Sequence, residues 1–189
     1  MRAFIKYFII FYFVSINTAY AHVLSEQSGW LHPLTGMDHV LAMIAVGAWS
    51  AIIGGRAVWI VPSFFLVFMF IGGLIGLTQA DLMYTEQGIA LSVLLLGIAI
   101  AVKGKIPTVL ASVCTALFGV CHGYAHGYEI PVIDDATFYV AGFLVTTAFL
   151  HIVGLVCAHY LLKYKWGEST LRVLGLFCAI SGMFLLVRL

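Results

Sequence analysis

Residues 107–129 read PTVLASVCTALFGVCHGYAHGYE, an apolar run that ends in polar side chains. In a helix, His122 and His126 lie four residues apart and Glu129 three further on, so the three share one face. A second stripe with the same spacing consists of Gly119, Gly123 and Gly127. Small residues of this kind let another helix approach closely. The segment therefore predicts a helix with ligands on one face and tight packing on another.

The whole chain is unusually apolar. Of its 189 residues, 63% are hydrophobic and 9% are charged, whereas a soluble domain has about 25% charged residues. So few charges cannot cover a soluble surface, and the composition predicts an all-α, polytopic membrane protein embedded in the lipid bilayer. The net charge of +1, without a Lys/Arg cluster, gives no indication of a nucleic-acid partner.

Residues 1–21 have the pattern of a secretory signal peptide. Two basic residues precede the apolar core Phe8–Ile16, and Ala19-Tyr20-Ala21 matches an A-x-A cleavage site. Cleavage would leave His22 at the N-terminus, where a free amine beside an imidazole forms a candidate metal-chelating pair. The alternatives are an uncleaved membrane anchor and a His22 without any metal role.

Residues 22–189 form one predicted domain with six apolar runs. A transmembrane helix needs about 20 residues. We expect such helices at about residues 33–53, 57–79, 88–102, 107–127, 136–162 and 170–187. The sequence thus predicts a bundle of six transmembrane helices after a cleaved signal peptide.

The charged residues predict an orientation. A cleaved signal places the mature N-terminus outside, and alternation then places a set of basic residues inside: Arg56, Lys103, Lys105, Lys163, Lys165 and Arg172. The outer loops carry only acidic charges, at Asp81, Glu86, Glu129, Asp134 and Asp135. Because Lys and Arg are enriched in cytoplasmic loops, we expect both mature termini outside.

A second polar motif opens the first predicted helix. His32 and His39 are seven residues apart, and Asp38 directly precedes His39. In one continuous helix the two histidines lie nearly on one face. Ionisable residues inside a bilayer usually face a partner or a cavity, and the topology places this motif at the same outer depth as His122–Glu129. We expect the first and fourth helices to pack through the glycine stripe and to join four imidazoles and two carboxylates in one metal site.

This ligand set favours a transition metal. Imidazole suits nickel, cobalt, zinc and copper, and the carboxylates either bind the ion or orient the imidazoles. Further inward, Thr147, His151 and His159 repeat at multiples of four residues and are candidates for a permeation path. The alternative for both groups is a network of hydrogen bonds that only joins helices.

The two motifs resemble the signature of the HupE/UreJ family of nickel/cobalt permeases. The matching residues are His32-x5-Asp38-His39 and His122-Gly-Tyr-Ala-His126-Gly-Tyr-Glu129, with Cys121 where the family has phenylalanine. The resemblance covers essentially the whole mature chain. It implies a secondary transporter of the bacterial inner membrane that imports nickel or cobalt, linked indirectly to the maturation of nickel or cobalt enzymes such as hydrogenase and urease. The metal would be bound transiently as cargo, without a prosthetic group.

Two other functions stay open at this stage. A membrane metalloenzyme could use a zinc ion to activate water, although the sequence has neither HExxH nor a serine beside the histidines. A metal-binding accessory protein for hydrogenase or urease assembly would bind the ion without passing it. We expect a transporter and no enzyme; the sequence leaves open the metal, proton coupling and a homo-oligomeric state.

Overall fold

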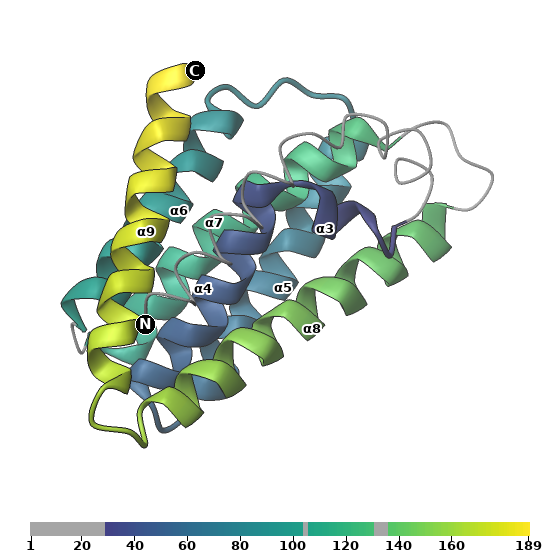
Figure 1. The fold of residues 1–189 in the computed structure, drawn as a ribbon. Coiled ribbons are helices and arrows are strands. Elements are labelled where there is room, and N and C mark those ends of the chain that lie inside the picture. The colour runs from purple at the N-terminus through teal and green to yellow at the C-terminus, as the bar shows by residue number, and fades with distance from the viewer. Residues whose placement is uncertain (1–28, 104–105, 131–135) are drawn as a thin grey trace.

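The computed structural model describes residues 29–103, 106–130 and 136–189 (Figure 1). Within these ranges every regular element is a helix: α3 (His32–Thr35), α4 (Met37–Ile53), α5 (Ala57–Leu77), α6 (Thr85–Val102), α7 (Thr108–Glu129), α8 (Ala136–Leu161) and α9 (Gly167–Arg188). The predicted all-α fold is confirmed. The predicted signal peptide of residues 1–21, the candidate ligand His22, and the loop charges Lys105, Asp134 and Asp135 lie outside the described residues.

The lengths and surfaces of the helices identify a multi-pass membrane protein. Helices α5 to α9 are each long and apolar enough to cross a membrane, whereas α4 is apolar but has only 17 residues. Large apolar side chains cover the outside of the bundle, for example Trp59 and Val109, which are about three-quarters exposed. An apolar surface of this extent is unfavourable in water. The count of six spans stays a prediction, because it depends on the short α4.

The first predicted helix is not continuous. It breaks at Gly36, whose backbone is extended (φ −90°, ψ 117°) and separates α3 from α4. A Cβ atom on Gly36 would lie 2.8 Å from both Asp38 Oδ1 and His39 Nδ1. Glycine therefore leaves room for these two side chains to fold back over the start of α4. The expected shared helical face of His32 and His39 was wrong for this reason.

The glycine stripe of α7 packs against α5, so the expectation that it packs against the first helix was wrong. A Cβ atom on Gly119, Gly123 or Gly127 would overlap carbonyl oxygens of α5, such as that of Met69 opposite Gly123. On α5, a Cβ atom on Gly72 would likewise overlap the backbone of α7. The stripe indicated a close helix contact correctly, but it contained no information about which helix makes it.

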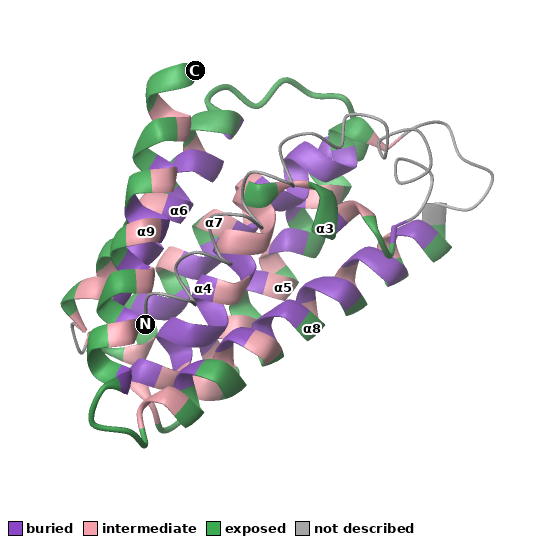
Figure 2. Ribbon diagram, viewed as in Figure 1, coloured by how far each residue is buried: buried purple, intermediate pink, exposed green. Residues whose placement is uncertain are grey.

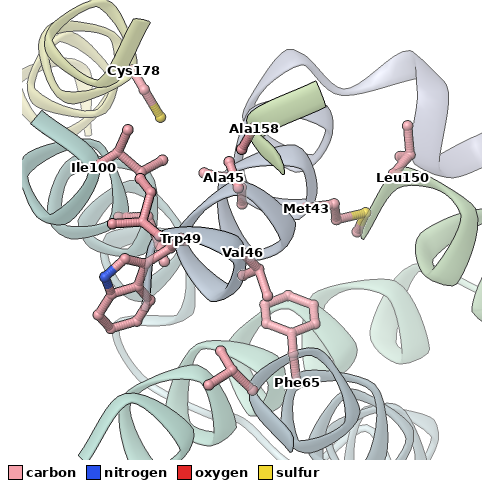
Figure 3. Packing of buried hydrophobic residues seen from close by; sticks show 14 of the residues in the cluster. Met43, Ala45, Val46, Trp49, Phe65, Ile100, Leu150, Ala158 and Cys178 are labelled. Atoms are coloured by element: carbon pink, nitrogen blue, oxygen red, sulfur yellow. The ribbon is translucent and has the colours of Figure 1, made fainter. Parts of the chain in front are cut away.

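Helix α4 lies at the centre of the bundle and contacts each of the other six described helices (Figures 1 and 2). Its closest partner is α8, where a Cβ atom on Gly47 would overlap the carbonyl oxygen of His151. Figure 3 shows Val46 of α4 facing Phe65 of α5, with Trp49 directed toward α6. The central position explains why α4 is largely buried although it is the shortest of the apolar helices.

The bundle has two distinct ends. The α4–α5 and α8–α9 turns lie at one end and the α5–α6 loop at the other (Figure 1). At the first end, Lys103 after α6 forms an ion pair with Glu168 of α9. The histidine motifs lie at the opposite end, at the start of α4 and the end of α7. This separation agrees with the predicted alternation of the helices, while the side of the membrane that each end faces stays a prediction.

Candidate metal site

The structure brings the two histidine motifs together. The ring centroids of His39 and His126 are 4.2 Å apart, those of His39 and His122 are 4.8 Å apart, and those of His32 and His126 are 4.8 Å apart. The four imidazoles therefore form a continuous chain in the order His32, His126, His39, His122. We call these four residues, with Asp38 and Glu129, the outer cluster.

The outer cluster runs from an exposed end to a fully buried end. The Glu129 side chain is 59% exposed, and its Oε2 atom lies 3.8 Å from Nε2 of His32. Ligand atoms of Glu129, His32 and His126 all lie within 4.8 Å of one another. Nitrogen ligands lie about 2.0–2.1 Å from a bound transition-metal ion such as zinc, so two ligand atoms on opposite sides of the ion are about 4 Å apart. A small contraction would therefore let these three residues share one cation.

Asp38 fixes the orientation of His39. Its Oδ1 atom accepts hydrogen bonds from the main-chain N–H and from Nδ1–H of His39, both at 2.9 Å. The proton on Nδ1 leaves the lone pair on Nε2. This Nε2 atom is buried and has no hydrogen-bond partner among the described residues. A carboxylate that holds one imidazole nitrogen while the other faces a site is the arrangement typical of metal-binding histidines.

Ser92 of α6 gives His122 the same kind of support, and no motif in the sequence indicated this role. The Ser92 hydroxyl donates to the carbonyl oxygen of Ile89 at 2.7 Å and lies 2.9 Å from Nε2 of His122. Because its only proton is used on Ile89, Ser92 accepts the proton of His122 Nε2–H. The lone pair of His122 is then on Nδ1, a buried atom without a partner in the part of the chain that the structure describes.

We expect Ser92→Ala to lower metal affinity and uptake by about 10-fold, because loss of such an orienting partner typically costs about 10- to 100-fold. The measurement is nickel uptake by cells that express equal amounts of the wild-type and variant proteins. Ser181→Ala is the matched control, since among the described residues Ser181 bonds only the carbonyl oxygen of Phe177 on its own helix, α9. Equal uptake by the Ser92 and Ser181 variants would show that Ser92 does not orient His122.

Apolar side chains surround the inner part of the cluster. The ring of Phe143 lies 4.2 Å from that of His126, and the ring of Phe65 lies 5.5 Å from that of His122. A small cavity beside His126, between α5, α7 and α8, is lined almost entirely by apolar atoms. Low polarity strengthens electrostatic interactions, so a cation bound here would interact strongly with the cluster.

Other residues singled out from the sequence lie apart from the outer cluster. Cys121 points toward α6, where a Cβ atom on Gly88 would lie 2.6 Å from its sulfur. Thr147 and His151 are buried on α8. His159 is exposed on the outside of the same helix, where its ring contacts that of Tyr160. The three α8 residues therefore do not share one buried face, and the expected path does not include His159 in this structure.

The fold and the cluster together define a multi-pass helical membrane protein with a group of partly and fully buried imidazoles flanked by carboxylates. The chain belongs to the HupE/UreJ family: residues 10–185 match the family described as HupE / UreJ protein, which confirms the resemblance of its motifs. It is similar to Protein HupE of Rhizobium leguminosarum bv. viciae, with 44% identity over 176 residues that cover 90% of this chain and 91% of that protein. No solved structure matches the chain.

Proposed function

We propose that the protein is a secondary transporter that imports nickel or cobalt across the bacterial inner membrane. One observation carries the proposal: three imidazoles of the outer cluster have buried nitrogen atoms without a partner among the described residues. These atoms are His39 Nε2, His122 Nδ1 and both ring nitrogens of His126. Burial of unpaired polar atoms is unfavourable, and imidazole nitrogen is a good ligand for nickel and cobalt. Membership of the HupE/UreJ family supports the same metals.

The gradient of exposure supports movement of the ion rather than permanent storage. Glu129 lies at the exposed end, His126 is 5% exposed and His122 is fully buried. A cation attracted by the carboxylate could therefore exchange water for imidazole in steps as it enters the bundle. With both mature termini outside, as the charge distribution predicts, the exposed end of the cluster faces the periplasm and the path leads inward.

The membrane potential is sufficient to drive this import without ATP. A divalent cation that moves inward across 100 mV gains about 4.6 kcal/mol, twice the value for a single charge. This free energy corresponds to a concentration ratio of more than about a thousandfold at equilibrium. The sequence has no GxxxxGK[ST] nucleotide-binding loop, so a potential-driven permease is the mechanism that we propose.

The experiment is metal uptake into liposomes that contain the purified protein. We expect nickel or cobalt to accumulate, and the accumulation to rise steeply when an inside-negative potassium diffusion potential is imposed with valinomycin. Empty liposomes at the same potential control for leakage, and competition by zinc or copper measures selectivity. Metal binding without flux would instead support an accessory protein, and flux that does not respond to potential would contradict the proposed driving force.

A further inference from the structure

A second group of buried polar atoms lies deeper in the bundle, on α8. Thr147 is fully buried and His151 is 2% exposed. Nδ1–H of His151 donates a 2.7 Å hydrogen bond to the main-chain carbonyl oxygen of Met43 on α4. The lone pair of His151 is therefore on Nε2. Neither this Nε2 atom nor Oγ1 of Thr147 has a partner within residues 29–103, 106–130 and 136–189.

These two residues continue the outer cluster inward. Phe143, Thr147 and His151 follow one another at four-residue intervals and so lie along one face of α8. Phe143 contacts the ring of His126 at 4.2 Å, which places the outer end of this face against the cluster. The face therefore leads from the outer cluster toward the opposite end of the bundle.

The ring of Phe65 contacts one histidine of each group. Its centroid is 5.5 Å from that of His122 and 5.1 Å from that of His151, which it meets edge to face. Phe65 is fully buried, and Figure 3 shows it pointing from α5 toward Val46, on the side of α4 that also carries Met43. The two histidines are therefore neighbours that share a contact with the same phenylalanine ring.

If His151 had only a structural role, only one of its two ring nitrogens would be needed. The hydrogen bond to the Met43 carbonyl ties α8 to α4 and requires only Nδ1 of His151. It does not explain why a second buried polar atom without a described partner, Oγ1 of Thr147, lies one turn away on the same face. An imidazole with one nitrogen fixed by a carbonyl and the other unpaired repeats the pattern seen at His39 and His122.

We propose that His151 Nε2 and Thr147 Oγ1 form a second, inner binding site for the same divalent cation, with Phe65 in contact with both this site and the outer cluster. This inference rests on the proposed transport function and deepens it. One imidazole and one hydroxyl hold an ion less tightly than several imidazoles and carboxylates, and water would complete its coordination. Weaker binding at the inner site favours release, which conduction requires.

Two substitutions at His151 separate metal binding from the structural tie. In His151→Asn, the amide nitrogen can take the position of Nδ1 and keep the bond to Met43, but no ligand replaces Nε2. In His151→Gln, the amide group reaches the position of Nε2, and its oxygen can serve as a weak ligand, but the bond to Met43 is lost. The proposal predicts the larger loss of uptake in His151→Asn, whereas a purely structural role predicts it in His151→Gln.

The readouts are nickel flux into liposomes and cobalt binding to purified protein followed by visible absorption. We expect at least about a 10-fold loss of flux and one fewer bound cobalt in His151→Asn, with membrane insertion and binding at the outer cluster retained. Thr147→Val should lower flux and Thr147→Ser should keep it, because only serine retains the hydroxyl group.

The proposal is overturned if His151→Asn transports normally, if His151→Gln alone loses flux, or if both lose flux with unchanged cobalt stoichiometry. Loss of flux in both variants together with one fewer bound cobalt supports it. Failure of the underlying transport function has a different signature, because the wild-type protein itself would then bind metal without flux.

Discussion

Replacement of His126 with alanine is expected to abolish metal accumulation, with a loss of at least about 100-fold. Loss of a partner that only orients a ligand costs about 10- to 100-fold, and removal of a ligand should cost more. Both nitrogens of His126 are buried without a partner among the described residues. Its ring also contacts His32 at 4.8 Å and His39 at 4.2 Å, so it joins the exposed end of the cluster to the buried end. Uptake of radioactive nickel, normalised to the amount of protein in the membrane, measures the effect.

His39→Ala should give the same loss, because His39 connects His126 to His122. His159→Ala is the control: this histidine lies on α8 but is exposed on the outside of the bundle, and we expect it to leave uptake unchanged. Normal nickel accumulation in both the His126 and His39 variants would contradict the proposed transport site. Loss of uptake in His159→Ala would instead support the permeation path through His159 that the sequence spacing predicted.

The meeting of the two histidine motifs could be predicted because it depends on topology alone. Alternating spans place the start of the first helix and the end of the fourth at the same depth, and the structure brings His39 and His126 together. The groups that orient His122 and His151 could not be predicted in this way. Ser92 and the carbonyl oxygen of Met43 lie on different helices from the histidines that they contact. Neither a single serine in an apolar run nor a main-chain carbonyl has a sequence pattern that indicates such a role.

Other predictions were wrong because they assumed that residues at regular helical spacing share one face over two or more turns. His151 and His159 are eight residues apart, which corresponds to a rotation of about 80° around the helix. That rotation is sufficient to place His159 on the exposed surface while His151 stays buried. At Gly36 the backbone leaves the helix altogether, and the side chains of Asp38 and His39 occupy the space that a Cβ atom at this position would need. Helical spacing in the sequence assumes an unbroken helix and does not reveal such a break.

We expect Gly123→Ala to destabilise the fold although it adds only one methyl group. A Cβ atom at this position would overlap the backbone of Met69 on α5, and backbone atoms cannot move aside as a flexible side chain can. Overpacking in a close interface costs about 1–3 kcal/mol, and we expect the upper part of this range. Because His122 and His126 flank Gly123 on α7, the displacement of this helix should also lower nickel uptake. The measurements are the thermal unfolding midpoint in detergent and uptake in liposomes.

Gly73→Ala provides a control within the same interface. Gly73 lies on α5 opposite α7, but a Cβ atom there would be 3.6 Å from the carbonyl oxygen of Gly123, an ordinary van der Waals distance. Alanine also favours the helix over glycine by about 1 kcal/mol, so Gly73→Ala should keep or raise the midpoint and preserve uptake. Equal stability of the two variants would show that α5 and α7 can separate enough to admit a methyl group. In that case the glycines of α7 would not be what holds His122 and His126 in position.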